Sequence, residues 1–287
     1  MSSTRTALVT GAWGPGQEIA GMVAATLEAE GWHIRSTAPH RSDAGHWADH
    51  HVGDLRSPEF IEALLADLPG GGASEADIDP AGRSGGVIVV HLAPLVAVAD
   101  AAIAHPGNPA EALDIATRGT YRLLMGCLST GIGRVVQASS LSSFDAYEHG
   151  LEVTEQWRPR PGPNADDLAP YLAELTAREF TRDPLVHNPL EVTCLRLAAL
   201  RGGDDSSRPP TDIRAMWTVD AARAIGLAIA AQATGNRGSD RGHRWRILHV
   251  ASGAPDARYT SAIAHQVIGY SPAWLDTAST GTREGAR

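Results

Sequence analysis

The stretch of this sequence best equipped for chemistry is a glycine-rich turn near its start. Residues 7–9 are apolar, positions 11, 14 and 16 are glycine, and residues 18–29 show the apolar spacing of a helix. This order of strand, turn and helix directs backbone N–H groups at a pyrophosphate on the helix N-terminus. Gly11 would permit the tight turn, and Gly14 would let a phosphate approach the backbone. The turn residues expected to hold a dinucleotide are Gly11, Trp13, Gly14, Pro15, Gly16 and Gln17.

The turn departs from the usual glycine spacing at one position. Gln17 stands where a third glycine is expected, and Gly16 comes one residue early. Because that glycine normally permits close packing of helix on strand, we expect a displaced helix start or a tighter pocket. The alternative interpretation is a glycine-rich turn that binds nothing.

The end of the second predicted strand indicates which dinucleotide would bind. Residues 31–35 have the pattern of a strand, and residues 36–41 contain no carboxylate that could hold the ribose hydroxyls of NAD. Arg35 or Arg41 could instead meet a 2′-phosphate, because a guanidinium matches phosphate geometry. We therefore expect NAD or NADP, with a weak preference for NADP, while a solvated arginine is an equal alternative.

Composition excludes several classes of partner. The chain has 287 residues, a net charge of −9 and no lysine, so its 24 basic residues are all arginine. The negative charge argues against nucleic acid or an anionic membrane as a main partner. No apolar run approaches the ~20 residues of a membrane span, and the first strand follows the N-terminus directly, so we expect a cytoplasmic protein. Cys127 and Cys194 lack metal-type spacing and are expected to be buried and reduced.

Four histidines crowd one segment. His40, His46, His50 and His51 suggest a metal, and two of them have helical i,i+4 spacing. No carboxylate–cysteine framework completes a site, so a solvated loop is favoured and no metal is predicted.

The remaining elements must place the turn in a larger sheet. Strand and helix patterns alternate, which predicts an α/β protein with a doubly wound parallel sheet. Predicted strands cover residues 52–55, 86–93, 134–138, 190–196 and 245–250, and predicted helices cover 58–68, 109–128, 167–182, 218–232 and 259–267. Ser57 is the expected N-cap of the first of these helices. Residues 69–85 are a predicted surface insertion, and the tail after Ser271 is expected to be loose.

A series of short motifs in a fixed order resembles one enzyme family. The motifs are Thr10-Gly11-x-x-Gly14, Gly53-Asp54-Leu55, His91-Leu92-Ala93, Gly119-Thr120, Arg134-Val135-Val136-x-x-Ser139-Ser140, residues 190–196 and residues 219–224. Together they resemble the extended short-chain dehydrogenase/reductases, the NAD-dependent epimerase/dehydratases, and among these the uronate dehydrogenase-like branch. The resemblance runs from about residue 5 to residue 272.

The resemblance implies a Rossmann-type fold and a set of site positions. It divides the chain into a dinucleotide-binding domain over 1–200 and a small substrate lobe over 201–287, with residues about 217–253 partly returning to the first domain. It places Asp54 and Leu55 beside the adenine, and Ser140 and Tyr171 in the catalytic positions. The loop past the cofactor's ribose and phosphates is Leu92, Ala93 and Pro94.

The catalytic set of the family is incomplete in this chain. The family pairs its tyrosine with a lysine four residues later, which binds the nicotinamide ribose and favours the ionised tyrosine; here that position is Leu175. A free tyrosine hydroxyl has a pKa of ~10, so about one in a thousand is ionised at pH 7. Arg178 is two turns along and could replace part of the charge. The family's asparagine is Ala116, and the residues after the serine are Leu141 and Ser142. The chain is therefore expected to be a degenerate member.

The expected activity is NAD(P)-dependent oxidoreductase or epimerase-like chemistry on a small sugar- or polyol-like hydroxyl. A non-catalytic relative that serves as sensor or interaction module, or a non-redox enzyme on the same fold, is the alternative. A homodimer through residues 109–128 and 167–182 is expected, with Leu123, Leu124, Leu128, Leu172 and Leu175 as its apolar positions. The substrate would meet Ser139, Ser142, Arg208, Arg214 and Trp217, and an anionic group on it would suit the two arginines.

Overall fold

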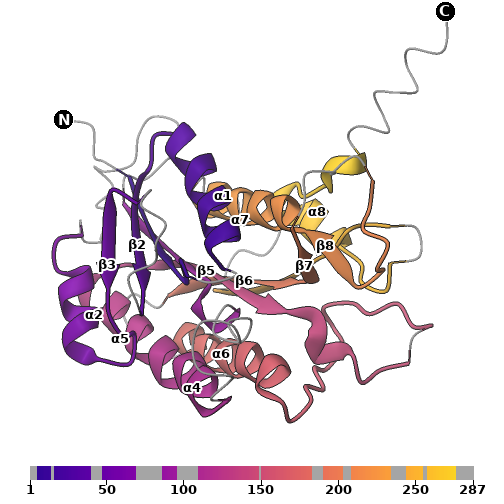
Figure 1. The fold of residues 1–287 in the computed structure, drawn as a ribbon, viewed down its shortest axis with the longest axis horizontal. Helices are drawn as coiled ribbons and strands as arrows, with labels where there is room; N and C mark the ends of the chain where they lie inside the picture. The colour runs from indigo at the N-terminus through magenta and orange to yellow at the C-terminus, as the bar shows by residue number, and fades with distance from the viewer. Residues whose placement is uncertain are drawn as a thin grey trace, which may run out of the picture.

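A parallel sheet lies between two layers of helices in the computed structural model of this chain (Figure 1). The layer formed by α1, α7 and α8 covers one face of the sheet, and α2, α4, α5 and α6 cover the other. The residues that the structure describes are 5–13, 16–39, 47–68, 86–95, 109–148, 150–182, 190–202, 208–233, 244–254 and 257–275. The predicted insertion at 69–85 and the last twelve residues of the tail, 276–287, lie outside them.

The main sheet has seven strands in the order β3-β2-β1-β4-β5-β6-β9, and every neighbouring pair is parallel. The strand order reverses between β1 and β4, which is the switch point where open α/β sheets bind ligands. The predicted doubly wound α/β fold is therefore confirmed. The strands are β1 (Thr6–Thr10), β2 (His33–Ala38), β3 (Asp49–Val52), β4 (Val87–His91), β5 (Arg134–Ser140), β6 (Glu191–Leu197) and β9 (Trp245–Val250).

The helices return the chain between parallel strands, which requires a crossover on one face of the sheet. Ser57 caps α2 as predicted, because its side-chain oxygen accepts a hydrogen bond from the backbone N–H of Phe60 at 3.1 Å. The helices are α1 (Gly16–Ala29), α2 (Pro58–Leu65), α4 (Pro109–Asp114), α5 (Thr120–Thr130), α6 (Ala165–Arg182), α7 (Thr218–Ala233) and α8 (Ala262–Ile268).

Several predicted boundaries move. The third strand ends at Val52, so residues 53–55 form a turn, and β5 continues through Ser140. The predicted helix over 109–128 is divided by a π-helical turn at Ile115–Gly119. The last helix begins at Ala262 rather than 259. Two short strands that were not predicted, β7 (Ala199–Arg201) and β8 (Ala215–Trp217), pair with each other.

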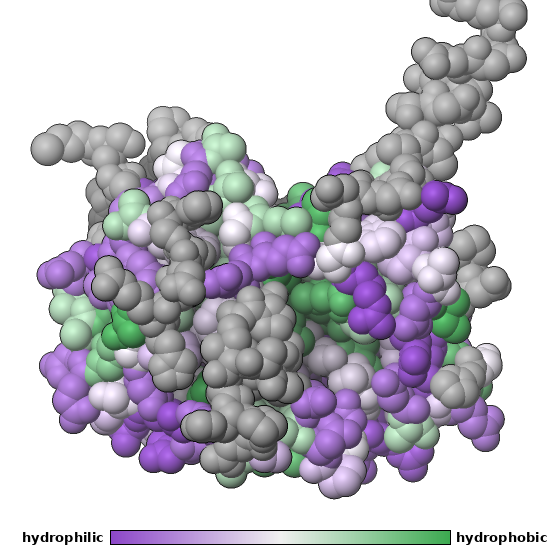
Figure 2. Space-filling view, viewed as in Figure 1, coloured by the Kyte–Doolittle hydropathy of each residue, from purple (hydrophilic) through white to green (hydrophobic). Residues whose placement is uncertain are grey.

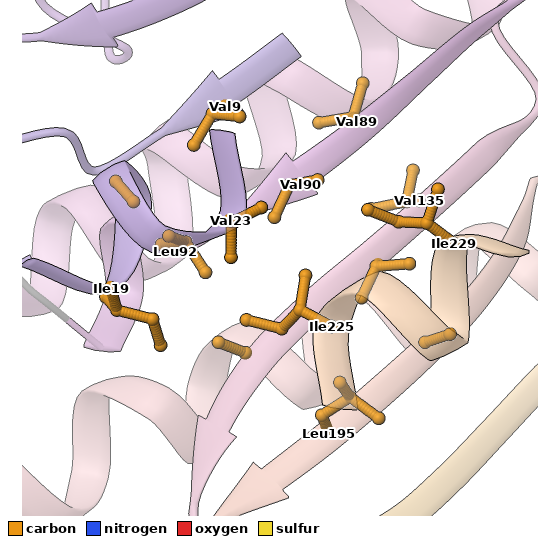
Figure 3. Packing of buried hydrophobic residues seen from close by; sticks show 14 of the residues in the cluster. Val9, Ile19, Val23, Val89, Val90, Leu92, Val135, Leu195, Ile225 and Ile229 are labelled. Carbon is orange, nitrogen blue, oxygen red and sulfur yellow. The ribbon is translucent and has the colours of Figure 1, made fainter. Parts of the chain in front are cut away.

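The core fills both faces of the sheet, and Figure 3 shows part of the face that α1 and α7 cover. There Val90 of β4 lies beside Val23 of α1. The side chains of Val9, Val23, Val90 and Ile225 are fully buried, so the contact between this layer and the sheet is apolar.

Both cysteines are free and buried, as expected. Burial raises the pKa of the Cys127 thiol to about 12, which makes it unreactive at neutral pH. Within the described residues, no helix combines the length and the apolar character needed to cross a membrane.

Candidate active site

The turn between β1 and α1 approaches the end of β4 closely. Gly11 has a φ of +90°, and a Cβ at this position would lie 2.8 Å from the backbone nitrogen of Ala93. Only glycine satisfies both conditions, so the tight turn predicted from the sequence is present. α1 begins at Gly16, whose backbone N–H donates to the carbonyl of Trp13 at 2.9 Å. Gly14 and Pro15 lie outside the described residues.

The predicted cofactor residues converge on one edge of the sheet. Asp54 and Leu55 follow β3, Leu92, Ala93 and Pro94 follow β4, and the glycine turn follows β1. Because parallel strands end at the same edge, these segments lie side by side. Leu92, Ala93 and Pro94 are buried at this edge, whereas Gln17 is half-buried in the first turn of α1.

A hollow with ≈ 280 Å³ of empty space, open to solvent, lies on the β2–β3 side of this edge. Trp13, only 8% exposed, and Leu55 contribute apolar surface, and Asp54 contributes a carboxylate. The hydroxyl of Thr37 is buried here and has no hydrogen-bond partner in the described part of the chain. The full lining is Trp13, Thr37, Ala38, Pro39, Gly53, Asp54, Leu55, Arg56 and Ile115.

Arg56 organises the rim of this hollow. Its Nε donates to both oxygens of Asp54 at 2.8 and 2.9 Å, and its Nη2 donates to Glu111 of α4 at 3.0 Å. Partial burial opposes the charge of Asp54, but the hydrogen bonds and charge of Arg56 outweigh it and lower the pKa of Asp54. The rim therefore keeps an ionised, hydrogen-bond-accepting carboxylate at neutral pH.

One of the two arginines expected to contact a 2′-phosphate is bound to other parts of the protein. Arg35 points away from the edge: its Nε donates to Asp49 at 2.8 Å and its Nη1 to the carbonyl of Leu64 at 3.0 Å. Its side chain is 12% exposed, so it cannot meet a ligand at the end of β2. Arg41 lies outside the described residues. The preference for NADP therefore has no structural support.

A buried histidine joins three elements beneath the switch point. His91 lies 2.8 Å from the hydroxyl of Thr10 through Nδ1 and 2.9 Å from the hydroxyl of Thr120 through Nε2. Complete burial lowers the pKa of His91 to about 3, so the ring is neutral. This neutral bridge ties β4 to β1 and to the first turn of α5.

Ser140 and Ser139 have different environments although they are neighbours. The Ser140 hydroxyl, at the end of β5, donates to the hydroxyl of Ser142 at 2.9 Å and accepts the Ser142 backbone N–H at 3.1 Å. Ser140 and Ser142 are half-buried. Ser139 is buried and donates to Oε1 of Glu174 at 2.5 Å. Ser139 was predicted to meet substrate, but it contacts the protein interior instead.

A buried ion pair that the sequence analysis missed lies next to these serines. Arg196 of β6 donates through Nε and Nη2 to Glu174 of α6 at 2.9 and 2.7 Å, and both side chains are 3% exposed. Burial disfavours the charge of Arg196, but Glu174 outweighs that effect and raises the pKa of Arg196. The signals were an acidic residue on the inward face of a helix and an arginine inside an apolar strand.

The strand register explains how these groups meet. Ser139 of β5 is paired with Arg196 of β6, which is paired with His249 of β9. Arg196 Nη1 lies 3.5 Å from Nε2 of His249. Burial, with a contribution from the charge of Arg196, lowers the pKa of His249 to about 3, so this ring is neutral. Ser139, Arg196 and His249 are thus neighbours on three adjacent strands, and Glu174 of α6 binds the first two.

Tyr171 is half-buried on α6, one turn before Glu174. Because α6 runs back from the carboxyl edge of the sheet, the Ser139–Glu174 bond brings Tyr171 and Ser140 to the same edge. Leu175 contributes no charge there. Arg178, the predicted replacement cation, is 42% exposed and donates to Glu179 at 3.3 Å on the outer surface.

The residues predicted to meet substrate from the C-terminal region group around the β7–β8 pair. The indole N–H of Trp217 donates to the carbonyl of Arg208 at 2.7 Å, and Arg214 lies 3.6 Å from Asp212. Both arginines are exposed and Trp217 is half-exposed. In Figure 2 the surface of the molecule has a hollow to the right of its centre, and the bottom of this hollow is hydrophobic.

The structure describes part of the histidine-rich segment. Both His51, at 2.8 Å, and His33, at 3.0 Å, donate a hydrogen bond to the Asp49 carboxylate. Partial burial opposes the charge of Asp49, but Arg35 and these two histidines outweigh it and lower the pKa of Asp49 to about 2. His50 contacts a serine hydroxyl of β2 at 2.7 Å. Among the described residues, no group of three histidine, cysteine or acidic side chains is arranged to hold a metal. His40 and His46 lie outside the described residues.

The fold is shared with several solved structures. MoeE5 in complex with UDP-glucuronic acid and NAD superposes with a TM-score of 0.64 and 21% identity over 93% of each chain. UDP-N-acetylglucosamine 4-epimerase from Bacillus cereus superposes with 0.63 and 16% identity over 94% of each chain. A mutated uronate dehydrogenase gives 0.63 and 16% identity over 96% of this chain and 86% of that one. No family model and no curated protein matches this sequence.

Proposed function

We propose that this chain is a dinucleotide-binding member of the extended short-chain dehydrogenase/reductases that acts on the hydroxyl or carbonyl of a sugar-like substrate. The observation that carries the proposal is the convergence at one sheet edge of the Gly11 turn, the hollow beside Asp54 and the end of β5 at Ser140. Tyr171 precedes by one turn the Glu174 side chain that binds the neighbouring Ser139. MoeE5, which shares the fold, was solved with NAD and a UDP-sugar, and this supports both ligand classes.

The residues of the edge fit a bound dinucleotide. The hollow offers an apolar wall at Trp13, an ionised acceptor at Asp54 and the unpartnered hydroxyl of Thr37. The Gly11 turn brings backbone to the end of β4 without an intervening side chain. When bound, the nicotinamide would supply the group that accepts or donates hydride. NAD is the proposed cofactor, because Arg35 is engaged elsewhere.

Side chains of this protein would supply the proton transfer and the contacts to the substrate. The Tyr171 hydroxyl would exchange a proton with the substrate oxygen. The Ser140 hydroxyl, which accepts the Ser142 backbone N–H, would turn its proton from the Ser142 hydroxyl to donate a hydrogen bond to that oxygen. Arg208 and Arg214 would suit an anionic substituent of the substrate, such as a carboxylate or diphosphate.

One observation favours a second candidate function. The position of the family's lysine is Leu175, and Arg196, the buried cation that contacts α6, is already paired with Glu174. A chain with this arrangement would bind the dinucleotide but transfer protons poorly. A dinucleotide-binding module without turnover is therefore the alternative.

Titration calorimetry with NAD⁺, NADH, NADP⁺ and NADPH, followed by absorbance at 340 nm with UDP-glucuronate, UDP-glucose and free uronates, tests the proposal. We expect dinucleotide binding at micromolar to sub-millimolar Kd and turnover that Tyr171→Phe abolishes. Tyr121→Phe is the matched control, because Tyr121 is 45% exposed on α5. Binding without turnover supports the alternative, and the absence of binding to all four dinucleotides contradicts both.

We also propose a homodimer through α5 and α6, with a revised contact face. Leu123 and Leu124 are fully buried within the subunit and cannot contribute. Tyr121 and Met125 are exposed on α5, and the Tyr121 ring contacts Phe180 of α6 edge to face, with centroids 5.5 Å apart. Leu128 of α5 and Leu172 and Leu175 of α6 are half-buried. Light scattering at tens of micromolar should give twice the monomer mass, and a monomer mass contradicts the proposal.

A further inference from the structure

A short turn that follows β5 carries two serines of the candidate active site. We call residues 140–144 the serine turn: Ser140 is the last residue of β5, and Leu141–Phe144 form a 3₁₀-helical turn. The oxygen of the Ser140 side chain accepts the backbone N–H of Ser142 at 3.1 Å. The conformation of this turn therefore sets where the Ser140 oxygen lies.

Every backbone carbonyl of the serine turn accepts a hydrogen bond. Three of the donors are near in sequence: the Ser143 hydroxyl donates to Ser140 at 3.2 Å, the Asp145 N–H to Ser142 at 2.9 Å, and the Arg160 N–H to Ser143 at 2.7 Å. The first and the last carbonyl of the 3₁₀-helical turn accept from side chains that lie 118 and 114 positions further along the chain. A distant segment therefore holds both ends of this turn.

Tyr259 holds the start of the 3₁₀-helical turn. Its hydroxyl lies 3.2 Å from the carbonyl oxygen of Leu141 and 3.0 Å from a carboxylate oxygen of Asp145, so its single proton is shared between two acceptors. The side chain is buried. Burial, with a further contribution from the Asp145 carboxylate, raises the pKa of Tyr259, so the hydroxyl remains a donor at neutral pH.

Arg258 holds the end of the same turn. Its Nη2 donates to the carbonyl of Phe144 at 2.8 Å and to that of Tyr147 at 2.6 Å. Arg258 is also buried, and hydrogen bonds from a charged donor are stronger than those from a neutral one. The backbone here is fixed as well, because the Val153 N–H donates to the Arg258 carbonyl at 2.9 Å and Val153 forms a parallel β-bridge with Tyr259.

The side chain of Phe144 anchors the serine turn to the main sheet. The guanidinium carbon of Arg196 in β6 lies 5.1 Å from the centre of the Phe144 ring, and the His249 ring in β9 meets it edge to face at 5.3 Å. The turn is thus held through its carbonyls by residues 258–259 and through this ring by the sheet. A group fixed in this way loses little further conformational freedom when a ligand binds.

We propose that Arg258 and Tyr259 are positioning residues of the candidate active site, which hold the serine turn so that the Ser140 hydroxyl reaches the substrate oxygen. The inference rests on the proposed function, in which Ser140 donates to that oxygen. A misplaced Ser140 would weaken a contact that matters most in the transition state. The loss of either residue should therefore lower kcat more than it changes KM.

Tyr259→Phe tests the inference with the smallest change, because it removes one hydroxyl and keeps the ring. We expect kcat, read at 340 nm on whichever of UDP-glucuronate, UDP-glucose and free uronates the parent oxidises, to fall by about ten- to a hundredfold, with KM and the NAD⁺ Kd nearly unchanged. Tyr270→Phe is the matched control, because Tyr270 is also buried and its hydroxyl donates to the carbonyl of Ala251 at 2.9 Å. It should lose similar stability in thermal melts and keep its kcat. An unchanged kcat in folded Tyr259→Phe, or equal kcat losses in the two variants, overturns the inference.

Hydrogen–deuterium exchange tests the same inference without turnover. The N–H groups of Asp145 and Tyr147 are bonded to carbonyls of the serine turn, so they exchange when the turn opens. We expect faster exchange over residues 141–147 in Tyr259→Phe and in Arg258→Met, unchanged protection of β5, and no change at the turn in Tyr270→Phe. Parent-like exchange in both Tyr259→Phe and Arg258→Met overturns the inference. A parent that turns over none of the substrates contradicts the proposed function, and the exchange then decides alone whether residues 258–259 hold the turn.

Discussion

The Glu174–Arg196 pair allows a stability prediction whose size follows from the structure. Glu174→Gln keeps the shape of the side chain but removes the charge that faces Arg196, leaving a guanidinium that is 3% exposed without an anionic partner. Breaking a buried ion pair in this way costs ~3–5 kcal/mol, because the remaining charge stays desolvated. Against a total stability of ~5–15 kcal/mol, this is a large fraction. The Ser139 hydroxyl also loses its charged acceptor.

Urea unfolding followed by circular dichroism measures the loss. With a slope of ~3 kcal/mol per molar urea, the midpoint should fall by about 1–1.7 M. The double variant Glu174→Leu, Arg196→Met removes both charges and should recover most of the loss. Glu179→Gln is the matched control, because its pair with Arg178 lies on the exposed face of the same helix and should change stability by less than ~0.5 kcal/mol. A Glu174→Gln loss below ~1 kcal/mol, or a double variant as unstable as the single one, would refute this account of the pair.

Three further predictions follow from single positions. Leu175→Lys should place an ammonium one turn from Tyr171, raise turnover with UDP-sugars and move its pH dependence to lower pH, as read at 340 nm; a folded variant without any gain contradicts a role for the missing charge. Asp49, whose pKa lies below its unfolded value, stabilises the protein above pH ~4. That stabilisation is lost as the pH falls toward 2, so Asp49→Asn should be less stable than the parent in urea at pH 7 and equal to it near pH 2, and a constant difference would argue against the linkage. Gly11→Ala should cost ~1–3 kcal/mol and weaken dinucleotide binding, because its Cβ would lie 2.8 Å from the Ala93 nitrogen at a φ of +90°; Gly21→Ala, with open space around it, should not be destabilised in the same thermal melts.

The sequence by itself determined the fold and the sheet edge at which the candidate site was sought. Apolar runs of strand length alternate with amphipathic segments, and this alternation predicts a parallel sheet covered by helices. The structure contains that sheet. The glycine at position 11 also indicated the turn correctly, because a positive φ beside another backbone is a local requirement. The same local chemistry identified the Ser57 cap, which depends on residues only three positions apart.

The tertiary structure alone decided which polar side chains remain for a ligand. Ser139 and Arg35 looked available in the sequence, but each meets a partner from another element, Glu174 for the serine and Asp49 for the arginine. Glu174 and Arg196 are 22 positions apart and become neighbours only when α6 packs on the β5–β6 register. The physical reason is that a buried charge or hydroxyl must be paired, and the pairing depends on strand register and helix packing, which no local pattern encodes.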